Sequence, residues 1–372
     1  VELLMATGAD DETQGVVGLL QPSIASGRLS LVTELRPEQL GLVKERFPNF
    51  LQLLRKIRID PMDGAQTDGV LERVSYRLGR QHGVRLADET RQRIISLVER
   101  FHGVAELPGP AVELAERMAR THHERGVETD EGPRPLLQPE HAVESMASET
   151  GLPAELLDPN TDFDAGDVEQ FFEDSVFAQP EATDAMTSLV TVIRAGLEPP
   201  ERPLGSYLFI GPTGVGKTQT ALTLARYLFG SEDRLMRFDM SEYQDRWSAA
   251  RLVGRAKGEA GQLARRVREE PFQVILLDEI EKAHETVFDI LLQVLGEGRL
   301  TDALGQTVSF ANAVVVMTSN LGAGGPGSVG FSKSGSGPGV DGERRQRIKQ
   351  HYLSAVESFF RPEFVGRVDH VV

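Results

Sequence analysis

A glycine-rich octet contains the residue types and the spacing that best support chemistry. It consists of Gly211, Pro212, Thr213, Gly214, Val215, Gly216, Lys217 and Thr218. This order matches the phosphate-binding loop, in which glycines let backbone N–H groups face the phosphates and a following helix N-terminus adds partial positive charge. Lys217 would reach the β- and γ-phosphates, and the Thr218 hydroxyl would bind Mg²⁺. A strand-like run at 207–210 and a helix-like run at 218–228 flank the octet, which disfavours a chance glycine-rich turn.

Two acids follow a second apolar run. Residues 274–277 are apolar and lead into Asp278 and Glu279. Alone, this pattern fits any buried strand that reaches the surface. Beside a phosphate loop, it predicts that Asp278 holds the Mg²⁺ shell and that Glu279 orients and deprotonates the attacking water. Glu279 therefore favours hydrolysis of a nucleoside triphosphate over binding alone.

Two further polar residues are candidates on weaker grounds. Asn320 follows an apolar run at 313–317 and would hold the water or the γ-phosphate opposite Glu279, although an isolated asparagine is more often a turn former. Arg367 lies after a helix-like segment and before a strand-like one. It would stabilise transition-state charge in a neighbouring subunit, and a surface salt bridge is the alternative.

The elements that must position these residues form an α/β pattern from about residue 176. Before it, residues 29–32 and 57–59 predict strands, and apolar spacing predicts three amphipathic helices. Their apolar faces hold Val70, Leu71, Val74 and Leu78; Ile94, Ile95, Val98 and Phe101; and Val112, Leu114, Ala115 and Met118. The Pro-Gly-Pro at 108–110 would set the start of the third helix.

Four further segments have distinct composition. Residues 126–135 are polar and rich in Gly and Pro, as in a linker, and 139–150 predict a helix that ends at Gly151. Residues 158–174 carry seven acids and no base, which we interpret as a solvated connector or helix face rather than a binding tail. Small residues between 322 and 339 indicate a flexible loop.

Composition bounds the function classes. The 372 residues allow two or three domains, and the net charge of −16 disfavours a nucleic-acid partner. The sequence has no cysteine, which fits a reducing compartment, so we expect a cytoplasmic protein. We expect no membrane segment, because no stretch approaches roughly 20 apolar residues. Val1 opens within a strand-like run, so we expect a piece of a longer protein.

The motif blocks together resemble the second AAA+ module of the Clp ATPase family. They are RPLGSYLFIGPTGVGKT from Arg202, FDMSEY from Phe238, LDEIEKAH from Leu277, ILLQVL from Ile290, GRLTD from Gly298, TSNLG from Thr318 and FRPEF from Phe360. The resemblance implies an AAA+ large subdomain, with a parallel sheet flanked by helices, that uses ATP and Mg²⁺. It further implies a sensor-1 role for Asn320, an arginine-finger role for Arg367 across a homo-hexamer interface, and an adenine pocket at Val176 and Phe177.

A weaker resemblance covers the first 125 residues. LQPSIASGRL from Leu20, HGVRL from His82 and LPGPA from Leu107 are similar to the back half of the family's first AAA+ module. We therefore expect a partial large subdomain at 1–59, a helical small subdomain at 60–125, a connector at 126–165 and the second large subdomain at 166–372. The resemblance places the first module's own P-loop before Val1 and the second module's C-terminal lid beyond Val372. Residues 51–54 read Leu-Gln-Leu-Leu where the family has an arginine pair, so we expect an inactive first ring.

One departure from the family leaves two functions open. The segment at 254–261, where the family has an aromatic pore loop, contains none here. The first function is ATP-driven remodelling of protein substrates or adaptors. The alternative is an ATP-dependent structural or regulatory ring that does not thread substrate. A motor acting on DNA or RNA is disfavoured by the acidity and by the Clp-like blocks.

Overall fold

The computed structural model describes most of the chain, namely residues 15–35, 40–101, 106–124, 135–158, 160–197, 201–255, 259–302, 306–323 and 338–372. The strand-like start at Val1, nearly all of the 126–135 linker, the middle of the 254–261 segment and most of the 322–339 loop lie outside these ranges. No helix within them has the length and apolar content to cross a bilayer.

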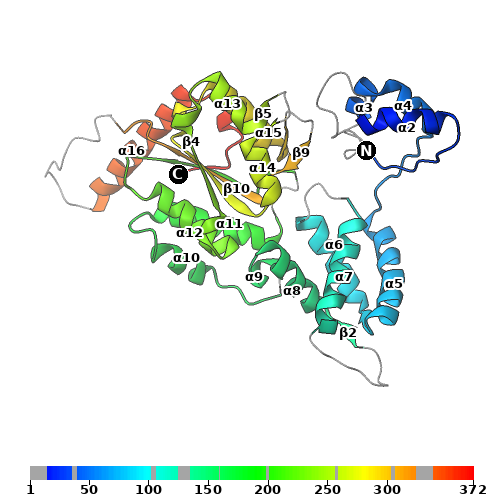
Figure 1. Cartoon of the computed structure of the whole chain (residues 1–372). Helices are drawn as coiled ribbons and strands as arrows, with labels where there is room; N and C mark the ends of the chain where they lie inside the picture. Colours follow the sequence, from blue (N-terminus) through cyan, green and yellow to red (C-terminus); the bar gives the residue numbers. More distant parts are fainter. Residues whose placement is uncertain are drawn as a thin grey trace.

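A five-stranded parallel sheet forms the centre of the C-terminal part (Figure 1). Its strands, in order across the sheet, are β11 (His370–Val371), β3 (Gly205–Ile210), β10 (Ala313–Ser319), β7 (Gln273–Asp278) and β4 (Leu235–Asp239). This confirms the strands predicted at 207–210, 274–277 and 313–317 and the strand after Arg367. Because all five run in the same direction, their carboxyl ends share one edge, the carboxyl edge, and their amino ends share the opposite one, the amino edge.

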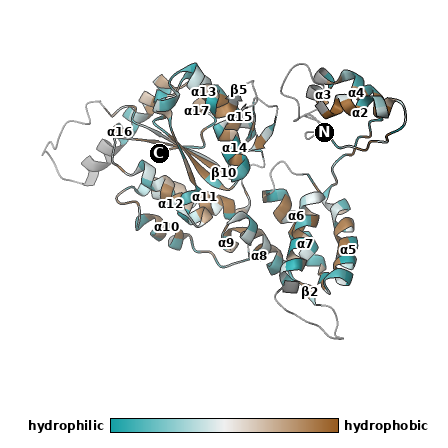
Figure 2. Cartoon of the chain, in the orientation of Figure 1, coloured by the Kyte–Doolittle hydropathy of each residue, from teal (hydrophilic) through white to brown (hydrophobic). Residues whose placement is uncertain are grey.

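Helices cover both faces of this sheet. Along β7 and β10, Leu276 and Val316 belong to one buried cluster, whereas Ile275, Leu277 and Val315 belong to the other. Burial on both faces explains why these strands are continuous apolar runs, and Figure 2 shows them brown along their length. The flanking helices include α11 (Pro180–Ala195) and α12 (Lys217–Phe229) on the first face, and α13 (Arg246–Val253), α14 (Gln262–Glu269) and α15 (Glu285–Glu297) on the second.

The remaining elements complete this part of the chain. The helices are α16 (Pro338–Phe359) and α17 (Pro362–Val365), and the 3₁₀ turns are η2 (Glu232–Arg234), η3 (Met240–Tyr243) and η4 (Ile280–Lys282). Two small antiparallel pairs join β5 (Gly254–Arg255) to β6 (Glu259–Ala260), and β8 (Arg299–Thr301) to β9 (Thr307–Ser309).

The segment before the sheet is helical. It contains α5 (Gly64–Gln81), α6 (Asp88–Phe101), α7 (Gly109–Glu124) and α8 (Pro139–Thr150), with a short parallel pair between β1 (Arg85–Leu86) and β2 (Leu136–Leu137). The three predicted amphipathic helices are thereby confirmed, and α7 begins within the Pro-Gly-Pro as expected. The predicted end of α8 is also confirmed, because Gly151 takes the left-handed conformation at φ 74°.

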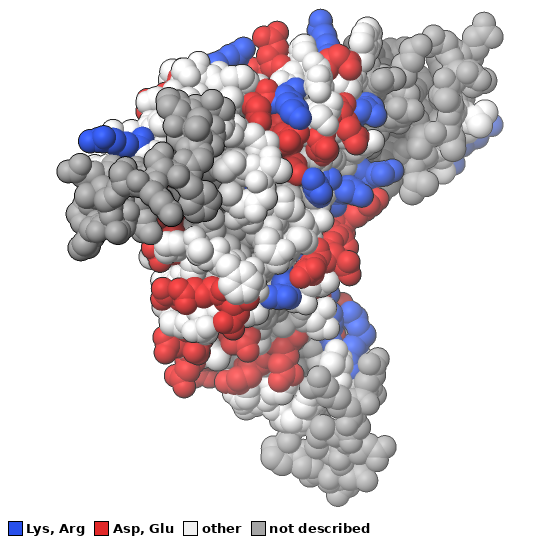
Figure 3. Space-filling model, turned by 90° about the vertical axis from the view of Figure 1, so that its left-hand side faces the viewer, with Lys and Arg blue, Asp and Glu red and all other residues white. Residues whose placement is uncertain are grey.

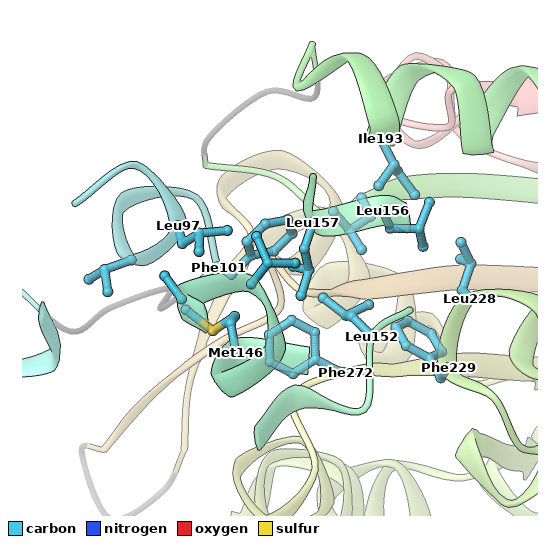
Figure 4. Close-up of a cluster of buried hydrophobic side chains, with 14 of the residues drawn as sticks. Leu97, Phe101, Met146, Leu152, Leu156, Leu157, Ile193, Leu228, Phe229 and Phe272 are labelled. Atoms are coloured by element: carbon cyan, nitrogen blue, oxygen red, sulfur yellow. The ribbon is translucent and has the colours of Figure 1, made fainter. Parts of the chain in front are cut away.

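The helical segment and the sheet share one core. Figure 4 shows Phe101 and Met146 beside Phe272, which immediately precedes β7. The rings of Phe101 and Phe272 have centroids 6.5 Å apart, and the side-chain amide of Asn312 donates to the Phe101 carbonyl at 2.6 Å. The short α9 (Ala154–Leu157) is packed into the same core. The described part of the connector is therefore a packed joint between the two segments.

The acidic stretch forms a solvated helix face, as predicted. Most of it lies in and around α10 (Ala165–Glu173), which buries Val168 and Phe172 and leaves its acids exposed. Figure 3 views the side of the molecule on which α10 and α16 lie, and acidic side chains gather on the lower part of this face.

The two strands predicted near the N-terminus are wrong. Residues 29–32 and 57–59 form no strand, and Val32, Ile57 and Ile59 are 96%, 76% and 89% exposed. A strand requires a neighbour for its backbone N–H and C=O groups, and among the described residues neither run has one. The described elements here are three helices, α2 (Gly15–Ala25), α3 (Leu40–Arg46) and α4 (Pro48–Leu53).

Candidate nucleotide-binding site

The glycine-rich loop joins β3 to α12 at the carboxyl edge. Gly214 and Gly216 have φ values of 86° and 106°, a region that side-chain-bearing residues rarely adopt. An added Cβ at either position would meet nothing within 4 Å, so the backbone conformation, and not space, requires glycine. These turns bring the loop to the N-terminus of α12, whose first residue is Lys217. Free N–H groups at this helix end favour an anion.

Lys217 extends across the loop toward β10. Its ammonium donates to the Gly211 and Pro212 carbonyls at 2.5 and 2.9 Å and to Asn320 Oδ1 at 3.0 Å. Partial burial lowers the pKa of Lys217, and the carboxylates of Asp278, Glu281 and Glu279 oppose that shift. The charge is thus held at the mouth of the loop by weak acceptors that a phosphate can replace.

Asp278 and Glu279 come from the end of β7, as predicted. One Asp278 oxygen accepts from the Thr318 hydroxyl, and the other pairs with Arg237 Nη2 at 2.5 Å. Glu279 has φ 57°, which is uncommon for a residue with a side chain, and its N–H donates to Thr318 Oγ1 at 3.0 Å. Strain of this kind concentrates at functional sites, where the surroundings must hold it.

Asn320 joins the lysine to the glutamate. Its Oδ1 accepts from Lys217, and its Nδ2 donates to Glu279 Oε1 at 3.1 Å. The second Glu279 oxygen is 2.5 Å from Lys282 Nζ. Asn320 is therefore a bridge within the site, and not only a turn residue after β10.

A cavity of about 430 Å³ collects most of the predicted side chains. The predicted residues that line it are Thr213, Gly214, Gly216, Lys217, Thr218, Asp278, Glu279 and Asn320. Gly211, Pro212 and Val215 belong to the same loop. The carbonyls of Gly211 and Pro212 accept from Lys217, and the carbonyl of Val215 accepts from Gln179 Nε2 at 3.1 Å. The residues fit a magnesium nucleotide, because the Thr218 hydroxyl and the Asp278 carboxylate are the hard oxygen ligands that Mg²⁺ takes beside phosphates.

Sequence reasoning missed two charged residues of this cavity. Arg237 and Asp239 lie on the edge strand β4 and line the cavity beside Asp278. The Ser241 hydroxyl and N–H donate to Asp239 and hold the pKa of that carboxyl below its usual range. Asp239 stands opposite Asp278 in the β4–β7 register. The sequence signal for Asp239 was an acid at the end of a mainly apolar run. Its importance becomes visible only when β4 pairs with β7.

Val176 and Phe177 do not line this cavity. Val176 is buried, and Phe177 is 79% exposed. Both lie just before α11, close in sequence to Gln179, which contacts the loop at Val215. Their adenine-pocket role stays a prediction.

Arg367 lies at the amino edge, apart from the other candidates. Its carbonyl accepts from Ser206 Oγ at 3.3 Å, at the start of β3, whereas the glycine-rich loop follows the end of that strand. Ser206 and Gly211 are separated by five residue steps along β3, or about 17 Å at roughly 3.3 Å per residue. Within the described part of the chain, the Arg367 guanidinium forms no ion pair, so the salt bridge considered from the sequence is not seen.

Comparison with known proteins agrees with this geometry. Residues 202–371 match the family described as AAA domain (Cdc48 subfamily). The chain is 30% identical over 428 residues to the ATP-dependent Clp protease ATP-binding subunit ClpC of Staphylococcus aureus (strain bovine RF122 / ET3-1), covering 99% of this chain and 52% of that protein. It is 35% identical over 358 residues to the chaperone protein ClpB of Agrobacterium fabrum (strain C58 / ATCC 33970), covering 92% and 39%. The chain thus spans about half the length of these relatives or less.

Solved structures of Hsp104 have the same fold. A closed-state reconstruction of Hsp104 with ATPγS and FITC casein has a TM-score of 0.76 at 27% identity, covering all of this chain and 62% of that one. An extended-conformation complex of Saccharomyces cerevisiae Hsp104 with casein gives 0.76 at 28% identity, with the same coverage. Residues 202–371 thus match an AAA domain, and the chain as a whole is similar to the Clp and Hsp104 ATPases.

Proposed function

We propose that residues 166–372 bind and hydrolyse ATP, within a ring whose subunits share their sites, to remodel other proteins. The observation that carries the proposal is the unbroken hydrogen-bonded path from Lys217 through Asn320 to Glu279, beside Asp278. It joins a phosphate-binding cation to the acid that would activate water. A site for nucleotide binding alone needs the first group and not the second.

Each residue has a separate task in this proposal. The loop amides and Lys217 bind the phosphates, and Thr218 and Asp278 hold the metal. Mg²⁺ neutralises charge on the β- and γ-phosphate oxygens when it is bound. Glu279 accepts the proton of the attacking water, and Asn320 orients that water or the γ-phosphate. The Thr318 hydroxyl aligns Asp278 and the Glu279 backbone together, because its oxygen contacts both.

Arg367 completes the site of a neighbouring subunit. Its backbone lies about 17 Å from its own loop on the estimate of roughly 3.3 Å per strand residue, which excludes direct action there without rearrangement. An exposed guanidinium that pairs with no acid among the described residues suits insertion opposite the phosphates of another copy, where it would neutralise transition-state charge. A homo-hexamer provides this arrangement at every interface.

Protein substrates are the proposed cargo. Support comes from the relatives, since two Hsp104 structures are named as complexes with casein. The 254–261 segment disfavours threading of a substrate, because its sequence offers no aromatic side chain to grip an extended chain. The alternative is an ATP-dependent structural ring that does not thread.

The helical segment has a supporting role in the proposal. In this proposal the chain divides into 1–59, 60–125, 126–165 and 166–372. The first module does not hydrolyse ATP and serves in assembly of the ring. The Asn312–Phe101 contact and the shared core give this segment a firm attachment to the ATPase module.

Steady-state ATP turnover by the full-length protein tests the function. Glu279→Gln should retain nucleotide binding and lose about 1000-fold in kcat, because the base is removed while the cavity shape is kept. Glu149→Gln, which removes an acid that pairs with Arg117 on the helical segment, is the matched control and should turn over normally. Turnover by Glu279→Gln at the wild-type rate would refute the assigned chemistry. ATP-dependent unfolding of a casein-like substrate would then separate remodelling from a purely structural ring.

A further inference from the structure

The backbone of Arg367 is held at the amino edge by hydrogen bonds at both its carbonyl and its N–H. Arg202 donates through Nη2 to the Arg367 carbonyl at 2.9 Å and through Nε to the Leu295 carbonyl, in the last turn of α15, at 3.0 Å. The Arg367 N–H donates to the Phe364 carbonyl at 3.0 Å. One guanidinium therefore ties the residue to the end of α15.

Asp369 extends this attachment to the central sheet. One of its oxygens accepts from both the N–H and the hydroxyl of Ser206, at 2.8 and 2.6 Å, and the other lies 3.1 Å from Arg202 Nη2. The Asp369 N–H donates back to Ser206 Oγ at 3.0 Å. Because Ser206 belongs to the buried strand β3, the turn that carries Arg367 is fixed to the interior of the sheet.

Two glycines in α15 and at its end leave room for this arrangement. At Gly298, a Cβ would stand 2.7 Å from the Glu201 carbonyl oxygen, so the segment leading to Arg202 can approach only a glycine. At Gly296, a Cβ would stand 2.8 Å from Arg367 Nη1 and 3.2 Å from its Cζ. The guanidinium of Arg367 thus lies directly over Gly296.

We propose that Gly296, Arg202 and Asp369 are positioning residues that aim Arg367 at the neighbouring subunit's nucleotide. Arg202 and Asp369 set its backbone, and Gly296 provides the surface on which its guanidinium rests. This inference rests on the proposed trans role of Arg367. Glycine is a poorer helix former than alanine, so its presence at 296 requires a reason other than helix stability.

Gly296→Ala separates the orientation of the Arg367 side chain from the stability of the protein. Alanine favours the helix, so the melting temperature should stay the same or rise, while the new Cβ displaces the flexible end of Arg367. We expect kcat for ATP to fall about tenfold, a fraction of the full contribution of an arginine finger, with KM changed less than about twofold. The matched control is Gly69→Ala in α5, where an added Cβ meets nothing within 4 Å. It should change neither parameter.

Mixed assemblies identify which site the substitution affects. Gly296→Ala subunits mixed with Lys217→Ala subunits should regain turnover, because the latter offer an undisturbed Arg367 to an intact loop. Gly296→Ala mixed with Arg367→Ala should regain none. An unchanged kcat for Gly296→Ala, in a protein that Arg367→Ala inactivates, would overturn the positioning role. Full activity of Arg367→Ala would instead overturn the trans role on which it rests, and a wild-type protein without turnover would refute the proposed function itself.

Discussion

The two edges of the central sheet hold functional groups in opposite ways. At the carboxyl edge, side chains converge on a cavity and bond to one another, as Lys217, Asn320 and Glu279 do. At the amino edge, Arg367 is exposed, and the hydrogen bonds that the described residues make to it hold its backbone. A group that meets its target within one subunit can be preorganised by its neighbours. Under the proposed trans role, the backbone of Arg367 must be held in place while its guanidinium stays available to another subunit.

The largest expected effect comes from removing the lysine side chain at the carboxyl edge. Lys217→Ala should lower ATP turnover at least about 10,000-fold and weaken nucleotide binding about 100-fold, because a charge-assisted contact to the phosphates is lost. Titration with a fluorescent ATP analogue and a turnover assay measure the two quantities. Wild-type affinity in this variant would show that the loop is not the phosphate site.

Removing the side chain at the amino edge should separate binding from turnover. Arg367→Ala should keep nucleotide affinity within about twofold and lower kcat about 1000-fold, since the contribution of an arginine finger arises in the transition state. The variant's affinity and kcat are measured on the assembled protein. A loss of affinity as large as that of Lys217→Ala would mean that the two edges do not differ in role.

The smallest effect should come from Arg237, which restrains Asp278 from the edge strand. Its side chain is 54% exposed, and an ion pair of that kind contributes at most about 1 kcal/mol. Arg237→Gln should therefore raise the magnesium concentration needed for half-maximal turnover by no more than about fivefold. Arg77→Gln, which removes a similarly exposed pair with Glu116 on the helical segment, is the control. An unchanged magnesium requirement in Arg237→Gln would show that Thr318 alone orients Asp278.

Local pattern predicted the strands of the carboxyl edge because each is apolar on both faces and ends in polar residues. The same reasoning failed at 29–32 and 57–59, where shorter, partly polar runs have no described strand beside them. Strand formation depends on neighbours that a short window does not contain. The Phe101–Phe272 contact likewise joins residues far apart in sequence, so the packed joint could not be seen in the connector's composition.

The site was predicted to the extent that its residues form contiguous motifs. Gly211 to Thr218 and Asp278–Glu279 needed only spacing and flanking elements. Arg237 needed the register that places β4 beside β7, and Gly296 needed the tertiary contact with Arg367. A single charge in a strand or a single glycine in a helix has no distinguishing signal until the surrounding fold is known.

Turnover by mixed rings tests the division between the edges most directly. Lys217→Ala and Arg367→Ala subunits, each inactive alone, are combined in equal amounts, and the ATP turnover of the assembled protein is measured. In a random mixture, about a quarter of interfaces pair an intact loop with an intact Arg367, so turnover should return to about a quarter of the wild-type rate. Rings that form normally but stay inactive at every mixing ratio would contradict the account.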